Sequence, residues 1–210
     1  MTHWQPTIGA IAGFLSILCF VPYIVTILQG KTKPNRATWW IWVILSAVIS
    51  ASYYSTGATN TIWLPVCGGI GQLMIAILSL KYGEGGWSRF DRLCLLGVGM
   101  SLLLWWQFNS PLIALLSNIL IDFLGALPTI KKSYYEPQTE NFLTWSLYLV
   151  ASTINLFAIE SWSVALWAFP LYIFLINTTI VIFLLRNKLL ILRTAYWQRQ
   201  LRKLSKINFM

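Results

Sequence analysis

The sequence predicts an all-α membrane protein with seven transmembrane helices, arranged as two parallel three-helix repeats around a linker helix (3+1+3). The first observation is composition: 57% of the 210 residues are hydrophobic and 10% are charged, against about 25% charged residues in a soluble domain. The second is a series of apolar stretches near the roughly 20 residues that a helix needs to cross a bilayer. Backbone groups in lipid must bond internally, which favours helices over open strands. The seven expected spans are Ile8–Leu28, Ala37–Tyr54, Ile62–Leu80, Leu93–Trp106, Leu112–Ile130, Phe142–Ile159 and Val164–Leu185.

The third observation is that all 15 lysines and arginines fall on one side of a membrane once these stretches are threaded through it. Because cytoplasmic loops are enriched in Lys and Arg, the N-terminus is expected outside and the C-terminus in the cytoplasm. The net charge of +9 is therefore assigned to topology and to anionic lipid headgroups, not to nucleic acid. No basic region precedes the first apolar run, so the first span is expected to belong to the mature fold. We expect a multi-pass protein of a plasma membrane or a bacterial inner membrane.

The first three spans and the last three are related by an internal repeat. A shift of 106 residues aligns the first two spans with the fifth and sixth, and a shift of 105 aligns the third with the seventh. Three is an odd number of spans, so two units joined directly would be inverted, and the extra fourth span makes them parallel. The matched pairs are Pro22 with Pro128, Asn35 with Asn141, Thr38 with Thr144, Trp39 with Trp145, Ser46 with Ser152, Pro65 with Pro170, and Gln72 with Asn177.

This repeat divides the chain into four parts. Residues 1–90 form the first three-helix unit, 91–110 the linker helix, 111–186 the second unit and 187–210 a basic tail. The fourth span, Leu93–Trp106, is short and is expected to extend into its flanks. The tail has an amphipathic pattern, with Leu190, Trp197, Leu201 and Leu204 near one helix face. It is expected to lie on the cytoplasmic membrane surface, with binding to a partner protein as the alternative.

In each unit a proline lies near the cytoplasmic end of the first span, at Pro22 and Pro128, and a basic loop follows it. Gln72 and Asn177 form a polar pair at midspan. These features are similar to those of the SWEET and PQ-loop superfamily of membrane transporters. The resemblance covers residues 8–185. It implies two three-helix units that rock around a site at the midplane, with Gln72 and Asn177 contacting a solute, which is a sugar in SWEET transporters. The Pro-Gln pair that gives the PQ-loop its name is absent at both positions, because Pro22 is followed by Tyr23 and Pro128 by Thr129. Proton-coupled amino-acid transport and vitamin transport therefore stay open as alternatives.

Asp122 is the only acidic residue well inside an expected span. At 1.5 Å per residue it lies roughly 15 Å from the start of its helix. Intramembrane acids usually face a cavity and mark a path for substrate or protons, so Asp122 is a candidate substrate-binding residue. The alternative is a hydrogen-bonded Asp that holds helices together. Asn118 lies one turn earlier on the same helix face and is a candidate with it.

The other candidate ligands are amides and hydroxyls. Gln72 and Asn177 can each donate and accept hydrogen bonds, which suits a neutral polyol or a zwitterion; the alternative is interhelical bonding worth about 0.6 kcal/mol each. The remaining candidate residues are three serines, two of them matched by the repeat: Ser16, Ser46 and Ser152.

Two prolines and two tryptophans are candidates for conformational change. Pro22 and Pro128 lie inside their helices, where proline removes a hydrogen bond, so each is a candidate hinge or a static kink. Trp39 and Trp145 begin the second helix of each unit and are candidates for gates, with an interfacial tryptophan belt or helix packing as the alternative.

The sequence offers little for catalysis. We expect no enzyme, cofactor or metal site, because the single histidine lies outside the spans and the three cysteines lack metal or disulfide spacing. A retinal protein would need a lysine in the last span, and Val164–Leu185 has none. The expected partners are a small polar solute and membrane lipids, with homo-oligomerisation left open. A receptor or assembly protein that transports nothing is the alternative of another class.

Overall fold

The structure is a computed structural model that describes residues 4–34, 36–83, 88–135 and 137–207. All regular elements within these ranges are helices, which confirms the all-α prediction. They are α1 (Gln5–Leu18), α2 (Phe20–Leu28), α3 (Arg36–Ser55), α4 (Trp63–Tyr82), α5 (Arg89–Phe108), α6 (Pro111–Tyr135), the short 3-10 helix η1 (Pro137–Thr139), α7 (Phe142–Leu156) and α8 (Val164–Ile207).

Five helical segments are long and apolar enough to cross a membrane: Gln5–Leu28, Arg36–Ser55, Trp63–Tyr82, Pro111–Tyr135 and Val164–Arg186. Two apolar helices are shorter, Leu95–Phe108 and Phe142–Leu156, and they correspond to the fourth and sixth expected spans. As expected, the fourth helix extends beyond its apolar stretch, as α5. The sixth ends three residues before the expected Ile159, because Phe157 and Ala158 donate their N–H groups to carbonyls three residues back and form a tight turn.

Local sequence signals explain several helix starts. Pro111 begins α6, where its missing N–H costs no hydrogen bond. The side chain of Asn141 accepts a hydrogen bond from the Thr144 N–H at 3.1 Å and caps α7. The first apolar segment is interrupted at Cys19, between α1 and α2. Pro22 follows within the first turn of α2, where it has no N–H to donate to the carbonyl four residues earlier.

In the second half, α6 runs through position 128 without a break, while the side chain of Pro128 lies outside the described residues. The two prolines paired by the repeat therefore do not interrupt their helices alike.

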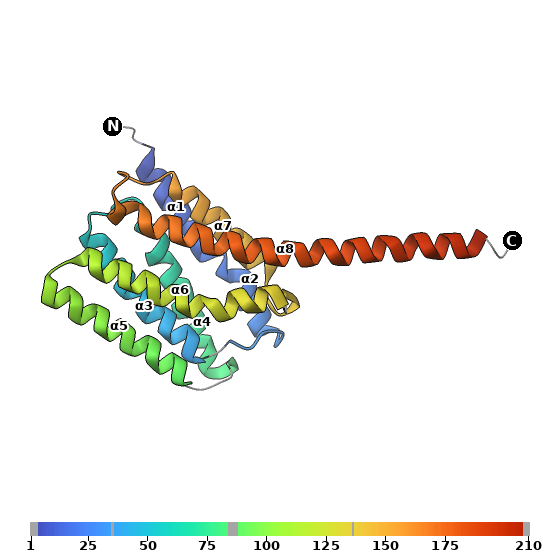
Figure 1. The fold of residues 1–210 in the computed structure, drawn as a ribbon, viewed down its shortest axis with the longest axis horizontal. Helices are drawn as coiled ribbons and strands as arrows, with labels where there is room; N and C mark the ends of the chain where they lie inside the picture. The colour runs from blue at the N-terminus through green and yellow to red at the C-terminus, as the bar shows by residue number, and fades with distance from the viewer. Residues whose placement is uncertain (1–3, 35, 84–87, 136, 208–210) are drawn as a thin grey trace.

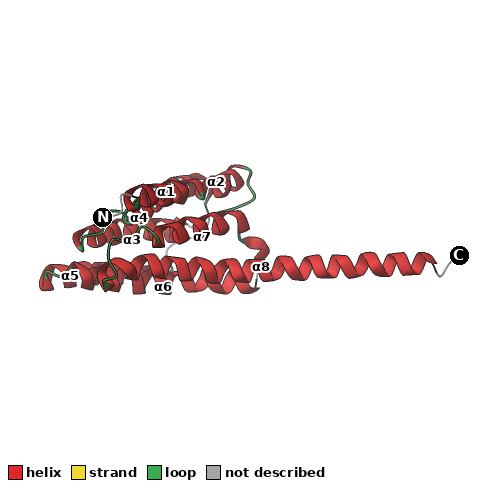
Figure 2. Ribbon diagram, turned by 90° about the horizontal axis from the view of Figure 1, so that it is seen from above, coloured by secondary structure: helices red, strands yellow, loops and turns green. Residues whose placement is uncertain are grey.

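The helices pack in a reciprocal pattern. In the first half of the chain α4 packs against both α1 and α3, and in the second half α8 packs against both α6 and α7. Between the halves, α1 packs on α7 and α3 packs on α6. Helix α5 packs on α6 and, over a smaller surface, on α3, at an edge of the bundle (Figures 1 and 2).

Helix α8 differs from the expectation of a separate tail. It continues without interruption from Val164 to Ile207, and Figures 1 and 2 show its C-terminal part projecting straight away from the bundle. No Gly or Pro follows Pro170, so no residue with a strong helix-breaking preference stops the helix at 187. A tail on the membrane surface would need a bend that this helix lacks. The side chains that made the tail pattern amphipathic lie outside the described ones.

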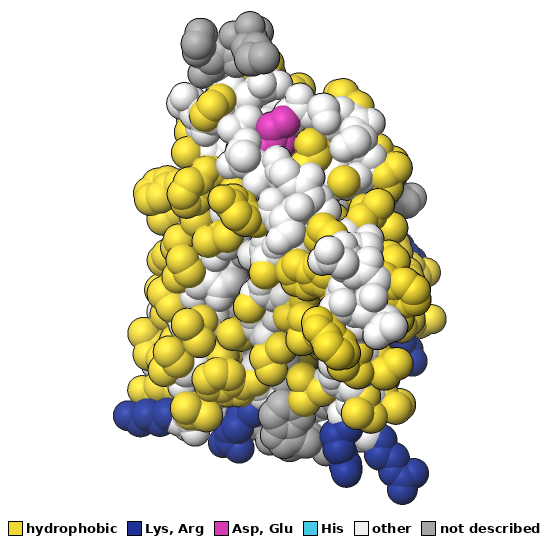
Figure 3. Space-filling model, turned by 90° about the vertical axis from the view of Figure 1, so that its left-hand side faces the viewer, with side chains coloured by type: hydrophobic (Ala, Val, Ile, Leu, Met, Phe, Trp, Pro, Cys, Tyr) yellow, Lys and Arg dark blue, Asp and Glu magenta, His cyan; other side chains and the backbone are white. Residues whose placement is uncertain are grey.

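On the face shown in Figure 3, apolar side chains form most of the surface, and Lys and Arg gather along its lower edge. Exposed residues include Ile77, Leu96 and Leu120, each more than half exposed. At the basic end, Arg36 joins α3 to the end of α4 by donating to the carbonyls of Ser79 at 3.0 Å and Gly83 at 2.8 Å. The surface fits a bundle that contacts lipid along its sides and water at its ends.

Candidate functional site

A cavity of about 320 Å³ lies between the two halves of the bundle. Its volume falls at the lower end of the roughly 300–1,000 Å³ typical of small-molecule pockets. Helices α2, α3 and α4 supply one part of its wall, and α6, α7 and α8 the other. The polar and charged side chains that line it are Lys33, Thr38, Ser46, Gln72, Asp122, Thr129, Glu140, Thr144 and Asn177, and the remaining lining is apolar or aromatic.

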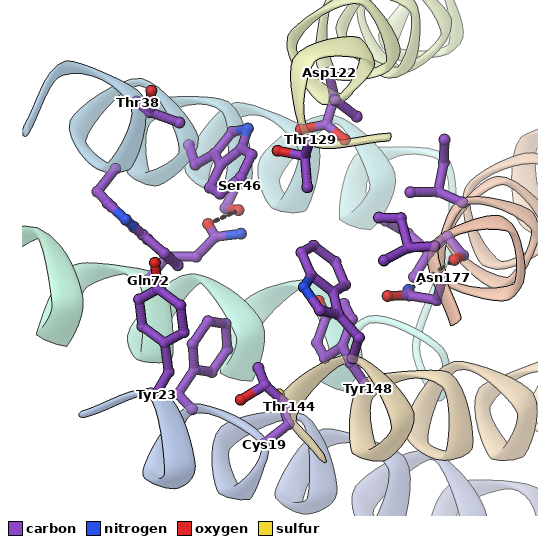
Figure 4. A pocket seen from close by; sticks show the side chains of 18 of the residues that line it. Cys19, Tyr23, Thr38, Ser46, Gln72, Asp122, Thr129, Thr144, Tyr148 and Asn177 are labelled. Atoms are coloured by element: carbon purple, nitrogen blue, oxygen red, sulfur yellow. Dashed lines mark hydrogen bonds between the residues drawn. The ribbon is translucent and has the colours of Figure 1, made fainter. Parts of the chain in front are cut away.

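Gln72 reaches the cavity from α4 with its amide held in place. Ser46 of α3 donates its hydroxyl to Gln72 Oε1 at 2.5 Å, and Figure 4 shows the amide nitrogen on the side of the cavity. Two residues predicted from the sequence are thus brought together, and Gln72 presents N–H donors to the cavity.

Asn177 of α8 lies across the cavity from Gln72 (Figure 4). Its Nδ2 donates to the Ile173 carbonyl of the same helix at 2.8 Å, which leaves Oδ1 as a buried acceptor with no protein partner. An unsatisfied buried acceptor costs roughly 1–3 kcal/mol. The repeat-related amides are therefore arranged differently: Gln72 offers a donor, while Asn177 keeps an unused acceptor.

Asp122 enters the cavity from α6. Its Oδ2 accepts a hydrogen bond from the Tyr172 hydroxyl of α8 at 2.5 Å. Among the described side chains, no lysine, arginine or histidine forms an ion pair with it. The carboxyl group is thus fixed by one phenol and is available to a ligand in a setting of low polarity.

Three predicted residues are not brought to the cavity. Asn118 is fully buried, and its Nδ2 donates to the Ala114 carbonyl at 2.7 Å. Ser16 donates to the Gly13 carbonyl at 2.7 Å, and Ser152 to the Leu149 carbonyl at 3.0 Å. Short polar side chains in helices commonly bond the carbonyl three or four residues back. Ser16 also donates to the Leu64 carbonyl of α4 at 3.3 Å, and Asn118 Oδ1 is a buried acceptor with no protein partner. These three residues are absent from the cavity lining, and a ligand role for them stays a prediction.

Trp39 and Trp145, the two tryptophans predicted as gates or belt residues, both line the cavity. Trp39 is 8% exposed, which excludes a position in a lipid-facing belt. It packs edge-on against Trp42 with ring centroids 5.1 Å apart and against Tyr23 at 5.4 Å. The Trp145 indole N–H donates to Glu140 Oε2 at 3.1 Å, near the basic end. A gate role for either ring stays a prediction.

The sequence analysis missed part of the aromatic lining. Phe20, Trp42, Tyr148 and Phe169 line the cavity as well, and Phe20 packs edge-on against Tyr148 at 6.1 Å between ring centroids. One signal was present: Trp42 and Tyr148 are related by the same 106-residue shift as the other pairs. Trp42 and Tyr148 each lie three residues after one of the paired tryptophans, so in both halves the two aromatic residues share one helix face.

Of the two hinge candidates, Pro22 has a described side chain, and it does not line the cavity. Pro22 is half-buried in α2, between Phe20 and Tyr23, which do line it. The side chain of Pro128 lies outside the described residues, although Ala126 and Thr129 on the same helix reach the cavity.

Within the described residues, no group of three His, Cys, Asp or Glu side chains could hold a metal ion. The Cys19 thiol donates to the Ser16 carbonyl at 2.8 Å.

Comparison of the chain with models of protein families, with curated proteins and with solved structures finds no match. The relation to the SWEET and PQ-loop superfamily therefore stays a prediction from the sequence. The structure itself contains five helical segments long and apolar enough to cross a membrane, and its helix bundle encloses a cavity with polar and aromatic walls.

Proposed function

We propose that this chain is a multi-pass membrane carrier that moves a small polar solute by alternating access, with sugar as the favoured solute class. The observation that carries the proposal is the convergence of Gln72, Asp122 and Asn177, from three different helices, on one cavity between the halves of the bundle. Ligand sites are mostly apolar pockets with a few convergent polar groups, and this cavity has that composition.

The helix packing supports a parallel 3+1+3 architecture. The third helix of each proposed unit, α4 or α8, packs against the other two helices of that unit. Across the interface the first helix of one unit meets the second helix of the other, as α1 with α7 and α6 with α3. This reciprocity is expected when two like units are related by a twofold axis along the membrane normal, with α5 as the linker.

The proposed topology has seven spans, with the N-terminus outside and the basic end in the cytoplasm of a plasma membrane or bacterial inner membrane. The Lys and Arg side chains at one end of the bundle in Figure 3 support this orientation through the positive-inside rule. The cavity lining extends from midspan to Lys33 and Glu140 near that end. In this proposal the structure therefore represents the state in which the cavity extends toward the cytoplasm.

Sugar is favoured because the cavity combines donor, acceptor and aromatic surfaces. The N–H groups of Gln72 suit a hydroxyl oxygen of the solute, and the unused Oδ1 of Asn177 suits a hydroxyl hydrogen. Trp39 and Trp145 provide flat apolar surfaces for the carbon faces of a ring.

Uptake of radiolabelled hexoses and disaccharides into proteoliposomes tests the proposal, with empty liposomes as the blank. The Asn177→Ala change should lower uptake about tenfold, because it removes a hydrogen-bonding group that faces the solute. Thr179→Ala is the matched control, since Thr179 lies on the same helix, is half-buried, is absent from the cavity lining, and donates its hydroxyl to the Leu175 carbonyl of that helix. If no sugar crosses with the intact protein, sugar transport is excluded.

A second solute class, a cation such as a protonated amine or a cationic amino acid, is favoured by Asp122. A carboxyl group with no ion pair among the described residues could bind a cation between aromatic faces. A thermal-unfolding screen of the purified protein separates the two classes, because a ligand that binds the native state raises the unfolding temperature. Stabilisation by arginine or choline without stabilisation by sugars would select the cation.

A further inference from the structure

At the end of the bundle opposite the basic residues, one carboxylate joins the two halves. Glu160, in the turn between α7 and α8, accepts hydrogen bonds from the loop between α3 and α4. Its Oε1 accepts from the Thr59 N–H at 2.7 Å, from the Thr59 hydroxyl at 3.1 Å and from the Asn60 N–H. The Thr61 N–H lies 3.4 Å from Oε1, and the Thr61 hydroxyl donates to Oε2 at 3.3 Å. We call this set, Thr59, Asn60 and Thr61 with Glu160, the outer tie.

Further hydrogen bonds cross between the halves beside the outer tie. The Tyr53 hydroxyl donates to the Leu166 carbonyl at 2.6 Å and lies 2.7 Å from the Thr61 hydroxyl. The Gln5 amide donates to the Ile159 carbonyl at 3.2 Å. Beside these bonds lies a buried apolar cluster drawn from both halves, and its residue Phe169 also lines the cavity. The members of this cluster include Ala12, Leu64, Leu115, Ala151, Leu166 and Phe169.

The outer tie has no equivalent carboxylate in the first half. The two repeat shifts place Glu160 opposite Tyr54 or Ser55, so the acid belongs to the second half alone. A carboxylate that accepts several backbone N–H groups from a turn forms a charge-assisted arrangement, about twice as strong as neutral hydrogen bonds. If the halves rock apart at this end, these bonds must break together.

We propose that the outer tie controls access to the cavity from the non-basic side, with Glu160 holding that end closed. This inference rests on the proposed carrier function. The hydrogen bonds that Glu160 accepts stabilise the state with the outer end closed relative to the state with the outer end open. Loss of the carboxylate removes interactions made only in the closed state and shifts the population toward the open state.

Thiol labelling of a cavity residue tests the proposal without any solute. The parent protein carries Ser46→Cys, as a reporter in the cavity wall, with the three native cysteines replaced by alanine. A charged, membrane-impermeant maleimide is added outside vesicles, and molecules with the basic tail inside are selected by protease protection of the tail. Glu160→Ala should raise the labelling rate about tenfold, because even one hydrogen bond to a charged group is worth that factor.

Ser161→Ala is the matched control. Ser161 lies in the same turn with an exposed side chain, so its removal should leave the rate unchanged. An equal rate in Glu160→Ala and in the parent would overturn the proposal. Glu160→Gln keeps the side-chain shape and one acceptor oxygen, and should give a smaller increase of about threefold. It replaces Glu160→Ala if that variant fails to fold, as judged by its unfolding temperature.

The labelling and uptake experiments test the outer tie and the carrier function independently. Faster labelling of Glu160→Ala, with no solute crossing in any variant, would support the outer tie and contradict the carrier. Solute uptake by the intact protein, together with a labelling rate that Glu160→Ala leaves unchanged, would support the carrier and contradict the outer tie.

Discussion

In the first half of the bundle position 16 is a serine, which is buried and bonds carbonyls of α1 and α4. In the second half the repeat-related position holds Asp122, which faces the cavity. A similar contrast separates Gln72, held by Ser46, from Asn177, which bonds its own backbone. The reciprocal packing of the helices is preserved while the polar groups are not. Two units with the same helix arrangement can thus present different polar side chains to one ligand.

The largest expected effect comes from removing the carboxyl group that only the second half has. Asp122→Asn keeps the shape and should lower uptake of the transported solute about a hundredfold, since hydrogen bonds to ionised groups contribute roughly 1.5–3 kcal/mol each. The repeat-related Ser16→Ala serves as the control and should stay within about twofold of the intact protein. Initial rates in proteoliposomes measure both; equal losses would show that the two halves contribute alike.

A smaller loss is expected when the carboxyl group stays but its partner is removed. Tyr172→Phe deletes the hydroxyl that donates to Asp122 at 2.5 Å. Uptake should fall about tenfold, mainly through a higher KM, because the carboxyl group loses its fixed orientation. Saturation kinetics separate KM from the maximal rate, and an unchanged KM would contradict a positioning role for Tyr172.

Helix packing offers a comparison that concerns stability. A Cβ at Gly13 of α1 would lie 2.7 Å from the Trp63 Cβ of α4, whereas the repeat-related residue in α6 is Ile119. Gly13→Ala should therefore cost about 1–3 kcal/mol of stability by overpacking. Gly99→Ala in α5 is the matched control, because no atom lies within 4 Å of its added Cβ. Thermal unfolding in detergent measures both, and equal unfolding temperatures would show that α1 can move away from α4.

The smallest effect is expected in the first half of the cavity wall. Ser46→Ala removes the hydroxyl that orients Gln72 while the amide itself stays. Uptake should fall about fivefold, the equivalent of one neutral hydrogen bond of roughly 1 kcal/mol. A loss as large as that of Asp122→Asn would mean that the first half determines binding.

Much of the helical architecture is predictable because apolar length and proline position are local signals. The ends of α5 and α7 lie within a few residues of the expected ones. Asp122, Gln72 and Asn177, which the sequence marks as polar groups inside apolar stretches, all line the cavity. Their meeting in one cavity depends on packing between helices far apart in the chain.

The candidates that lie outside the cavity lining do so because of helix rotation and competing local hydrogen bonds. Asn118 shares a helix face with Asp122, yet one turn of helix separates the cavity wall from a packed core, and the Asn118 side chain bonds Ala114. Ser16 and Ser152 were chosen for polarity and periodicity, which do not reveal whether a nearby carbonyl satisfies a hydroxyl. Part of the aromatic wall was missed because the abundant tryptophans also suited an interfacial belt.

The unbroken course of α8 makes the C-terminal segment a lever. The helix runs as one element of 44 residues, so any tilt of its membrane-crossing part is transmitted to its far end. A tilt of about 10° would displace the end of a projecting segment roughly 30 Å long by about 5 Å. A fluorophore near Ile207 would therefore report a motion of the second half that is too small to observe at the cavity itself.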